Sequence, residues 1–306
     1  MKWVKKGLIY AVDERIDWAT NSVLTPNPFL LNDEVIRVYG SFRDEKGIGR
    51  IGYVDVSAKN PKEIIKISNK PVIELGLKGT FDDNGMLLGD IIRVGDKIYM
   101  YYVGFQLVQH IKHMSATGLA ISTDGGETFE RVKQTPIADR VPNALFGRCF
   151  HTVLQDEGKF KIWYSVVYGW EHIEGKDYPQ YDIRYVESED GIHINDDEGI
   201  HCMAVGPGEY RIGRPRVIKR APDLYEMRYT YDTYTKEYIS GIAFSKDGIH
   251  WNREDEKAGL TKSESGWDSE MACYPVELAT KYGTYLFYDG NGMGATGFGY
   301  AEKVDD

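Results

Sequence analysis

The sequence has few cysteines that could cross-link a small secreted domain, and it lacks long apolar runs that could anchor a chain in a membrane. Its 306 residues include three cysteines, Cys149, Cys202 and Cys273, an odd number at wide spacing that predicts neither a disulfide framework nor a Cys-x-x-Cys metal site. The first apolar run, within residues 1–12, is too short for the core of a secretory signal. No apolar run approaches the roughly 20 residues of a membrane-spanning helix. We therefore expect a reduced, cytoplasmic protein without a membrane partner.

The chain also lacks an excess of basic residues. Its 37 Lys and Arg against 47 Asp and Glu give a formal net charge of −10, whereas a protein that neutralises nucleic-acid phosphates needs a basic face. We expect no nucleic-acid partner. P-loop, Rossmann and Gly-x-Ser-x-Gly motifs are absent, and the histidines lack the carboxylate-rich spacing of a metal site. The sequence thus predicts no cofactor and no metal.

What the chain does contain is an internal repeat. Three segments share the pattern Ser-x-Asp-Gly, beginning at Ser122, Ser188 and Ser245, and each follows a short apolar strand. Asp suits the cap of a tight turn, and Gly adopts the positive φ that such a turn requires. Because three equivalent copies indicate architecture rather than one active site, we interpret these aspartates as structural.

The strands group into five antiparallel units with almost no helical periodicity between them. The units span residues 24–68, 83–132, 146–195, 210–253 and 267–303, and residues 60–66 are expected to form an outer strand rather than a helix. Radial packing of such sheets covers both of their faces and leaves only short edges exposed. The predicted fold is therefore all-β, a five-bladed β-propeller that forms a single domain over residues 1–306.

In a propeller, residues at the start of the innermost strands line one mouth of the central funnel. Polar side chains are dense at these positions and at the ends of the second strands. The loop Gln109–Met114 is expected to connect two strands beside the pocket. The candidates for substrate binding are Asn27, Arg43, Arg148, His151, Trp170, Arg214, Tyr231, Asp289 and Asn291.

Three of these stretches carry a family resemblance. Phe81–Gly85, Gly266–Glu270 and Asp289–Gly292, the last followed by Gly297–Gly299, resemble glycosidase-like five-bladed propellers related to glycoside hydrolase families 43, 32, 68 and 130. The resemblance extends over all five units. It implies a carbohydrate substrate and two carboxylic acids from different blades, one that protonates the leaving oxygen and one that activates water or attacks.

On matching positions, the resemblance implies Asp83 as base or nucleophile and Glu270 as general acid, with Asp268 as the next candidate. The sequence departs from the family pattern in two blades. Blade 1 has Asn27 where families 43, 32 and 68 carry an acid, and blade 3 has Arg148 and His151 where family 43 often has a glutamate. The family 130 resemblance would instead permit phosphate as the nucleophile, held by Arg and His.

Four arginines near the predicted propeller axis point to an alternative to the carboxylate pair. Arg43, Arg148, Arg214 and Arg216 either neutralise acids of the inner strands or bind an anionic ligand, since guanidinium groups match carboxylate and phosphate geometry.

Three functions therefore remain open. The first is a glycoside hydrolase-like enzyme that cleaves or transfers a glycosyl group with the carboxylate pair. The second is a non-hydrolytic enzyme that acts on an anionic or nucleotide-activated sugar in polysaccharide biosynthesis, using His151 and the arginines. The third is a glycan-binding propeller without catalysis.

Overall fold

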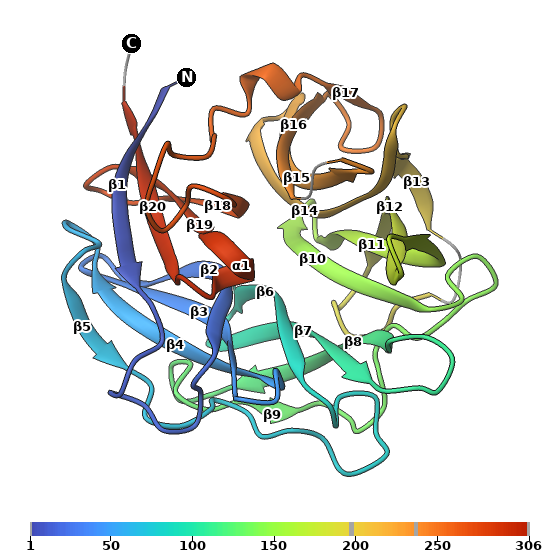
Figure 1. The fold of residues 1–306 in the computed structure, drawn as a ribbon, viewed down its shortest axis with the longest axis horizontal. Coiled ribbons are helices and arrows are strands. Elements are labelled where there is room, and N and C mark those ends of the chain that lie inside the picture. The colour runs from blue at the N-terminus through green and yellow to red at the C-terminus, as the bar shows by residue number, and fades with distance from the viewer. Residues whose placement is uncertain (1, 196–198, 236–237, 305–306) are drawn as a thin grey trace.

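Five four-stranded antiparallel sheets stand around a central axis like the blades of a propeller (Figure 1). The structure is a computed structural model and describes residues 2–195, 199–235 and 238–304. The predicted all-β, five-bladed fold is confirmed. Within the described part of the chain, no helix has the length and apolar character needed to cross a bilayer.

Each blade runs outward from an inner strand at the axis, and neighbouring inner strands contact one another around the ring. The first two blades are β2 (Ser22–Asn32), β3 (Val35–Arg43), β4 (Gly49–Ser57), β5 (Ile64–Ile67) and β6 (Met86–Val94), β7 (Lys97–Gln106), β8 (Met114–Ser122), β9 (Glu130–Arg131). The next two are β10 (Gly147–Asp156), β11 (Lys159–Ile173), β12 (Lys176–Ser188), β13 (Ile200–Met203) and β14 (Glu209–Ala221), β15 (Leu224–Thr233), β16 (Ile239–Ser245), β17 (Trp251–Arg253). The last blade is β18 (Cys273–Ala279), β19 (Thr284–Asp289), β20 (Phe298–Val304) and β1 (Lys2–Tyr10), and two short helical turns are η1 (Asp255–Lys257) and α1 (Asn291–Gly294).

The five sheets follow the predicted units, apart from strands that lie outside them. The expected outer strand of the first unit is present as β5, and β13 lies beyond the predicted end of the third unit. Both faces of the second strands are buried because neighbouring blades pack against each side. In β7, Met100 and Tyr102 pack toward the first blade, whereas Tyr99 and Tyr101 pack toward the third, as the alternation of side chains along a strand requires.

The three Ser-x-Asp-Gly turns join the second, third and fourth blades to the blade before them. The Asp190 carboxylate accepts hydrogen bonds of 2.8 Å from the backbone N–H groups of Ile192 and His193, and Gly191 has a φ of 72°. The carbonyl oxygen of Gly191 accepts a bond from the Tyr101 hydroxyl of the preceding blade. Gly248 accepts in the same way from the Trp163 indole. These aspartates therefore cap turns, as interpreted from the repeat.

The first strand of the chain closes the ring. β1 pairs with β20 as the outermost strand of the last blade, so the two ends of the chain lie side by side (Figure 1). The sequence had not placed this segment in any blade. The Lys5 ammonium forms a 2.6 Å ion pair with Asp268, whose side chain is 3% exposed, and thereby ties the closing strand to the loop before β18.

Replacing Lys5 with Met should destabilise the protein much more than replacing its neighbour Lys6. Loss of Lys5 leaves the buried Asp268 carboxylate without its cation, which costs about 2–4 kcal/mol of unfolding free energy. Lys6 forms an exposed pair with Glu302, so K6M should cost less than about 1 kcal/mol. Urea unfolding of K5M, K6M and the double variant K5M/D268N measures this. Equal losses for K5M and K6M would contradict the closing role of Lys5.

Candidate functional site

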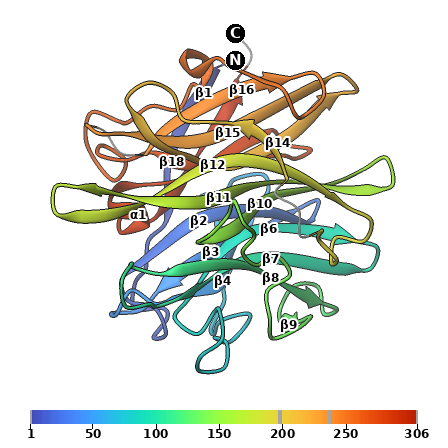
Figure 2. The ribbon, with the colours of Figure 1, turned by 90° about the vertical axis from the view of Figure 1, so that its right-hand side faces the viewer.

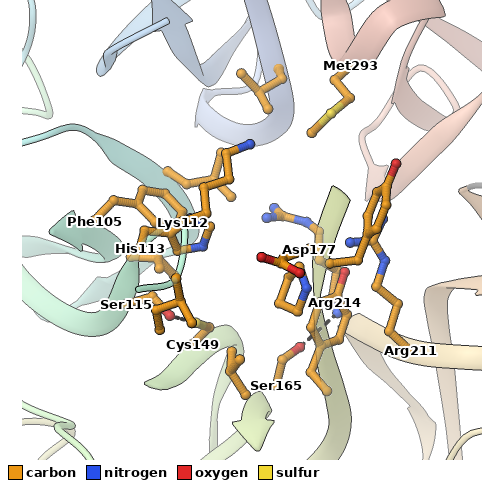
Figure 3. A pocket seen from close by; sticks show the side chains of 18 of the residues that line it. Phe105, Lys112, His113, Ser115, Cys149, Ser165, Asp177, Arg211, Arg214 and Met293 are labelled. Carbon is orange, nitrogen blue, oxygen red and sulfur yellow. Dashed lines mark hydrogen bonds between the residues drawn. The ribbon is translucent and has the colours of Figure 1, made fainter. Parts of the chain in front are cut away.

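A large cavity lies on the propeller axis, at the end where the inner strands begin. It encloses about 910 Å³ and receives side chains from all five blades (Figure 3). The inner strands contribute Leu24, Leu87, Cys149, His151, Arg211, Arg214 and Tyr274. We call this space the axial cavity. A cavity of this size accommodates a small organic ligand.

A β-bulge on every inner strand shapes the floor of the axial cavity. At the same level in each blade, the pairing with the second strand skips at Thr25, Gly89, His151, Arg214 and Tyr274. Bulges redirect side chains and occur often beside active sites. His151, Arg214 and Tyr274 are thereby brought to the cavity wall.

Three of the five bulges hold a non-glycine residue in the left-handed region. Thr25, Arg214 and Tyr274 have φ values of 57°, 54° and 54°, and each precedes a proline. Such a conformation costs of order 1–3 kcal/mol per residue and persists only where the surroundings enforce it. The strain coincides with the wall of the axial cavity, which marks this level of the propeller as the candidate site.

Three buried nitrogen atoms at this level have no hydrogen-bond partner among the described residues: Arg211 Nη2, Arg214 Nη1 and His151 Nδ1. The residues that carry them all line the axial cavity. Buried polar atoms are almost always paired, and leaving one unpaired costs about 1–3 kcal/mol. Their convergence on a cavity therefore indicates a place for a ligand with acceptor atoms.

Contacts with neighbouring side chains hold the Arg211 guanidinium in place. Its Nε donates to the Asp232 carboxylate, and its guanidinium lies 5.0–5.6 Å from the ring centres of four tyrosines, Tyr178, Tyr181, Tyr210 and Tyr238. Arg214 donates from Nη2 to the Leu88 carbonyl at 3.2 Å and stacks 4.7 Å from the Tyr274 ring. Both cations are thus fixed before any ligand arrives.

His151 is uncharged at neutral pH. Burial, and then the positive charges of Arg214 and Arg216, hold its pKa well below the usual value. A neutral imidazole has one donor and one acceptor nitrogen, so His151 can give or take a proton at the cavity wall.

Asp289 is a protonated carboxyl group buried directly behind this wall. Its Oδ2 accepts a 2.9 Å bond from the backbone N–H of Thr25, and its Oδ1 has no partner in the described chain. Burial raises the pKa of Asp289 to about 8, although Thr25, Arg214 and Arg43 each act to lower it.

Arg216 closes the bottom of the funnel. Its Nη1 donates to the carbonyl oxygens of Gly89, at 2.9 Å, and His151, and its Nη2 donates to Asp90 at 2.9 Å and Asn27 at 3.2 Å. Beyond this plug lies a smaller cavity of about 220 Å³, lined in part by Asn27, Asp90 and Arg216. Arg216 and Asn27 are therefore hydrogen-bonded to each other at the bottom of the funnel.

Two hairpins form the rim of the axial cavity. The loop between β7 and β8 contributes Gln109–His113, as expected, and the β11–β12 hairpin contributes Lys176–Pro179, the first residues of β12. Figure 2 shows the β11–β12 hairpin extending beyond the other blades. His113 joins the two hairpins, since its ring lies 5.4 Å from that of Trp170 and 4.9 Å from that of Phe105.

The three residues predicted to be catalytic lie away from this site. None of Asp83, Asp268 and Glu270 lines the axial cavity. The Asp83 carboxylate accepts from the backbone N–H of Gly79 in a turn, and the Glu270 side chain is exposed. All three precede their inner strands by several residues, so they lie in the loops before the strands. Their catalytic roles stay predictions.

The contacts of Asp268 repeat in another blade. Asp268 accepts from the Tyr288 hydroxyl at 2.9 Å and pairs with Lys5 of the outermost strand. Asp82 accepts from the Tyr102 hydroxyl at 3.0 Å and pairs with Arg131 of the outermost strand at 2.8 Å. The same acid–tyrosine–cation arrangement in two blades is what an architectural role produces.

The predicted binding residues divide into three groups. Arg43, His151 and Arg214 line the axial cavity, and Asp289 and Trp170 lie just behind its wall and rim.

Asn27, Arg148, Tyr231 and Asn291 make structural contacts instead. Arg148 donates to the backbone carbonyls of Asp139 and Asn195, and Tyr231 lies against the Arg253 guanidinium. Asn291 Oδ1 accepts from the backbone N–H groups of Glu270 and Met271, which fixes the loop before β18. Met271 lines the axial cavity, so Asn291 shapes the cavity wall indirectly.

Sequence reasoning missed Arg211, the tyrosines around it, and the rim lysines Lys112 and Lys176. Arg211 lies three residues before Arg214 in a stretch dense in arginine, which was the available signal. The tyrosines come from β12, β14 and the segment before β16, and no local pattern connects these segments. Among the described residues, no group of three or more His, Cys, Asp or Glu side chains could hold a metal ion.

Comparison with known structures supports the fold. The fold matches a glycosyl hydrolase from Bacteroides ovatus with a TM-score of 0.70 and 15% identity, covering 98% of this chain and 92% of that protein. It matches a thermostable family-43 glycoside hydrolase with a TM-score of 0.68 and 15% identity, covering 94% and 91%. The chain thus has the five-bladed propeller fold of glycoside hydrolases, as the resemblance implied.

A curated relative is more similar in sequence. The uncharacterized protein Rv1502 of Mycobacterium tuberculosis (strain ATCC 25618 / H37Rv) is 32% identical over 301 residues, which cover 98% of this chain and 99% of the relative. No family model matches the chain. The chain belongs to the same protein family as Rv1502.

Replacing Asp289 with Asn should change how stability depends on pH. An aspartate in the unfolded chain ionises near pH 4, whereas Asp289 in the folded protein keeps its proton up to about pH 8. Ionisation of the unfolded state therefore lowers the unfolding free energy of the wild type as the pH rises through this window. D289N lacks this titration. Its stability relative to wild type should increase steadily between pH 5 and pH 8 in urea unfolding. A constant difference would contradict a protonated Asp289.

Proposed function

We propose that this protein is a carbohydrate-active enzyme that binds an anionic sugar in the axial cavity. The observation that carries the proposal is the set of three unpartnered buried nitrogen atoms on Arg211, Arg214 and His151. Carboxylate or phosphate oxygens are the acceptors that guanidinium groups bind best. An anionic group placed between these side chains would satisfy all three nitrogens at once.

The rest of the cavity wall suits a sugar ring. Tyr178, Tyr181, Tyr238 and Tyr274 present aromatic surface near the two arginines, and aromatic side chains with a polar tip combine apolar area with a hydrogen-bonding group. The glycoside hydrolases that share the fold support a carbohydrate rather than another small anion as the ligand.

The charge of the site argues against the two-carboxylate mechanism as the first choice. Among the described residues that line the axial cavity, Asp177 is the one acid, and it is hydrogen-bonded to His172 at 2.8 Å. Glycoside hydrolysis of the usual type needs two carboxyl groups about 5–10 Å apart that flank the scissile bond.

The neutral His151 imidazole could instead accept a proton from a hydroxyl group of the ligand, while Arg211 and Arg214 stabilise the negative charge of the reacting group. This chemistry fits transfer from an activated sugar: the acceptor oxygen forms the new bond as its proton goes to His151, and the activating phosphate group leaves with the electron pair of the broken bond.

Binding measurements test the ligand class. We expect calorimetry to show that glucuronic acid and glucose 1-phosphate bind at least 10-fold more tightly than glucose. R214Q should weaken anion binding by about 1.5–3 kcal/mol, because a charged donor is lost from a buried site. R93Q is the matched control, since Arg93 is exposed and does not line the axial cavity. Equal affinity for glucose, or an unchanged affinity in R214Q, would contradict the proposal.

The reaction class needs a separate test. We expect that H151Q abolishes turnover of an anionic or nucleotide-activated sugar, whereas E270Q and D83N retain it, because only His151 reaches the axial cavity. Products are followed by NMR with and without inorganic phosphate. Cleavage of neutral glycosides that is lost in E270Q or D83N would restore the carboxylate-pair mechanism and overturn this one. Binding of the sugar without formation of any product would instead support a glycan-binding propeller without catalysis.

A further inference from the structure

A second level of positive charge lies at the mouth of the axial cavity. Arg43 from β3, Lys112 from the β7–β8 loop and Lys176 from the β11–β12 hairpin all line the cavity. Lys112 is labelled in Figure 3 on the opposite side of the cavity from Arg211. These three cations come from three different blades, so the charge is assembled by the fold and not by a local run of basic residues.

The cations at the mouth are not neutralised by the protein. None of the three forms an ion pair in the part of the chain that the structure describes, as is also true of exposed lysines elsewhere, such as Lys133 and Lys246. The nearby acid Asp177 is engaged by His172. In a chain with a net charge of −10, three cations and one acid, Asp177, line this opening, and the excess of positive charge forms a local field that attracts anions.

Aromatic side chains line the axial cavity together with both groups of cations. Arg211, Arg214 and the neutral His151 lie at the buried level, and Arg43, Lys112 and Lys176 lie at the mouth. The rings of Tyr178, Tyr181 and Phe105 line the same cavity. A ligand that fills the cavity would therefore meet both groups of cations and the aromatic surface that lines the same space.

We propose that the ligand carries two anionic groups on opposite sides of a sugar ring, one bound by Arg211 and Arg214 and the other by Lys112 and Lys176. This inference rests on the proposed function and specifies its substrate class. Two kinds of molecule share this chemistry: an acidic sugar activated by a diphosphate group, and an acidic sugar linked to a second acidic sugar. The anion at the buried level gives most of the affinity, and the anion at the exposed mouth adds a smaller, salt-sensitive part.

Calorimetry with matched ligands tests this inference. Glucuronic acid and UDP-glucose each carry an anionic group at one place, UDP-glucuronic acid carries them at both, and digalacturonic acid represents the linked acidic sugars. We expect UDP-glucuronic acid or digalacturonic acid to bind at least 10-fold more tightly than glucuronic acid. In K112Q/K176Q this advantage should shrink about 3- to 10-fold, as expected for two exposed charges, while the affinity for glucuronic acid stays within about 2-fold.

Salt dependence and a matched variant complete the test. The affinity of the wild type for the two-anion ligand should fall more steeply with salt than that of K112Q/K176Q. K133Q/K246Q removes two exposed lysines that do not line the cavity and should behave as wild type.

The outcomes separate the two proposals. If glucuronic acid binds in an Arg214-dependent manner and two-anion ligands gain nothing from Lys112 and Lys176, the two-anion inference is wrong and the proposed function stands. If no anionic sugar binds, the proposed function itself fails. Preference for UDP-glucuronic acid over digalacturonic acid identifies the activated sugar, and the reverse identifies the linked acidic sugar.

Discussion

The burial of two arginines beside the propeller axis, each with a nitrogen left unpaired, is the constraint around which this site is built. Taking a guanidinium group out of water is costly unless it is paired and hydrogen-bonded. The protein meets part of that cost through Asp232 and the tyrosines around Arg211, and through the Leu88 carbonyl and the Tyr274 ring at Arg214. The residues that carry the remaining nitrogens line a cavity. An anionic ligand would complete the pairing.

Such a site needs a rigid frame. Arg214 and Tyr274 occupy left-handed backbone conformations in front of prolines, and only a surrounding structure of higher stability can hold them there. The propeller supplies that structure in two ways. Its Asp-Gly turns are hydrogen-bonded to aromatic side chains of the preceding blade, and its first strand closes the last blade and pairs Lys5 with Asp268. Function and closure thus depend on each other through the inner strands.

Much of the fold could be predicted from the sequence because its signals are local. The turn at Asp190 and the continuous apolar and aromatic run of β7 each lie within a few residues, and repetition shows that they are architectural. The closing strand β1 could not be predicted in this way, because its partner β20 lies at the other end of the chain and neither strand has a pattern that specifies the other. The same holds for the tyrosines that surround Arg211.

The candidate site was harder to predict, for a reason of strand geometry. The acids Asp83 and Glu270 match a family pattern, but they fall in loops before the inner strands. The side chains that reach the axial cavity are set by the bulges at His151 and Arg214, and a one-residue insertion in a strand changes the direction of each side chain that follows. Sequence therefore identified His151 and Arg214 as candidates but could not rank them above the carboxylates.

A crystal structure of the protein with bound glucuronic acid or glucose 1-phosphate tests the central claim most directly. The account predicts anionic oxygens within about 2.7–3.2 Å of Arg211 Nη2 and Arg214 Nη1, with the sugar ring against the tyrosines. A sugar bound instead between Asp83 and Glu270, with these two nitrogens still unpaired, would contradict it.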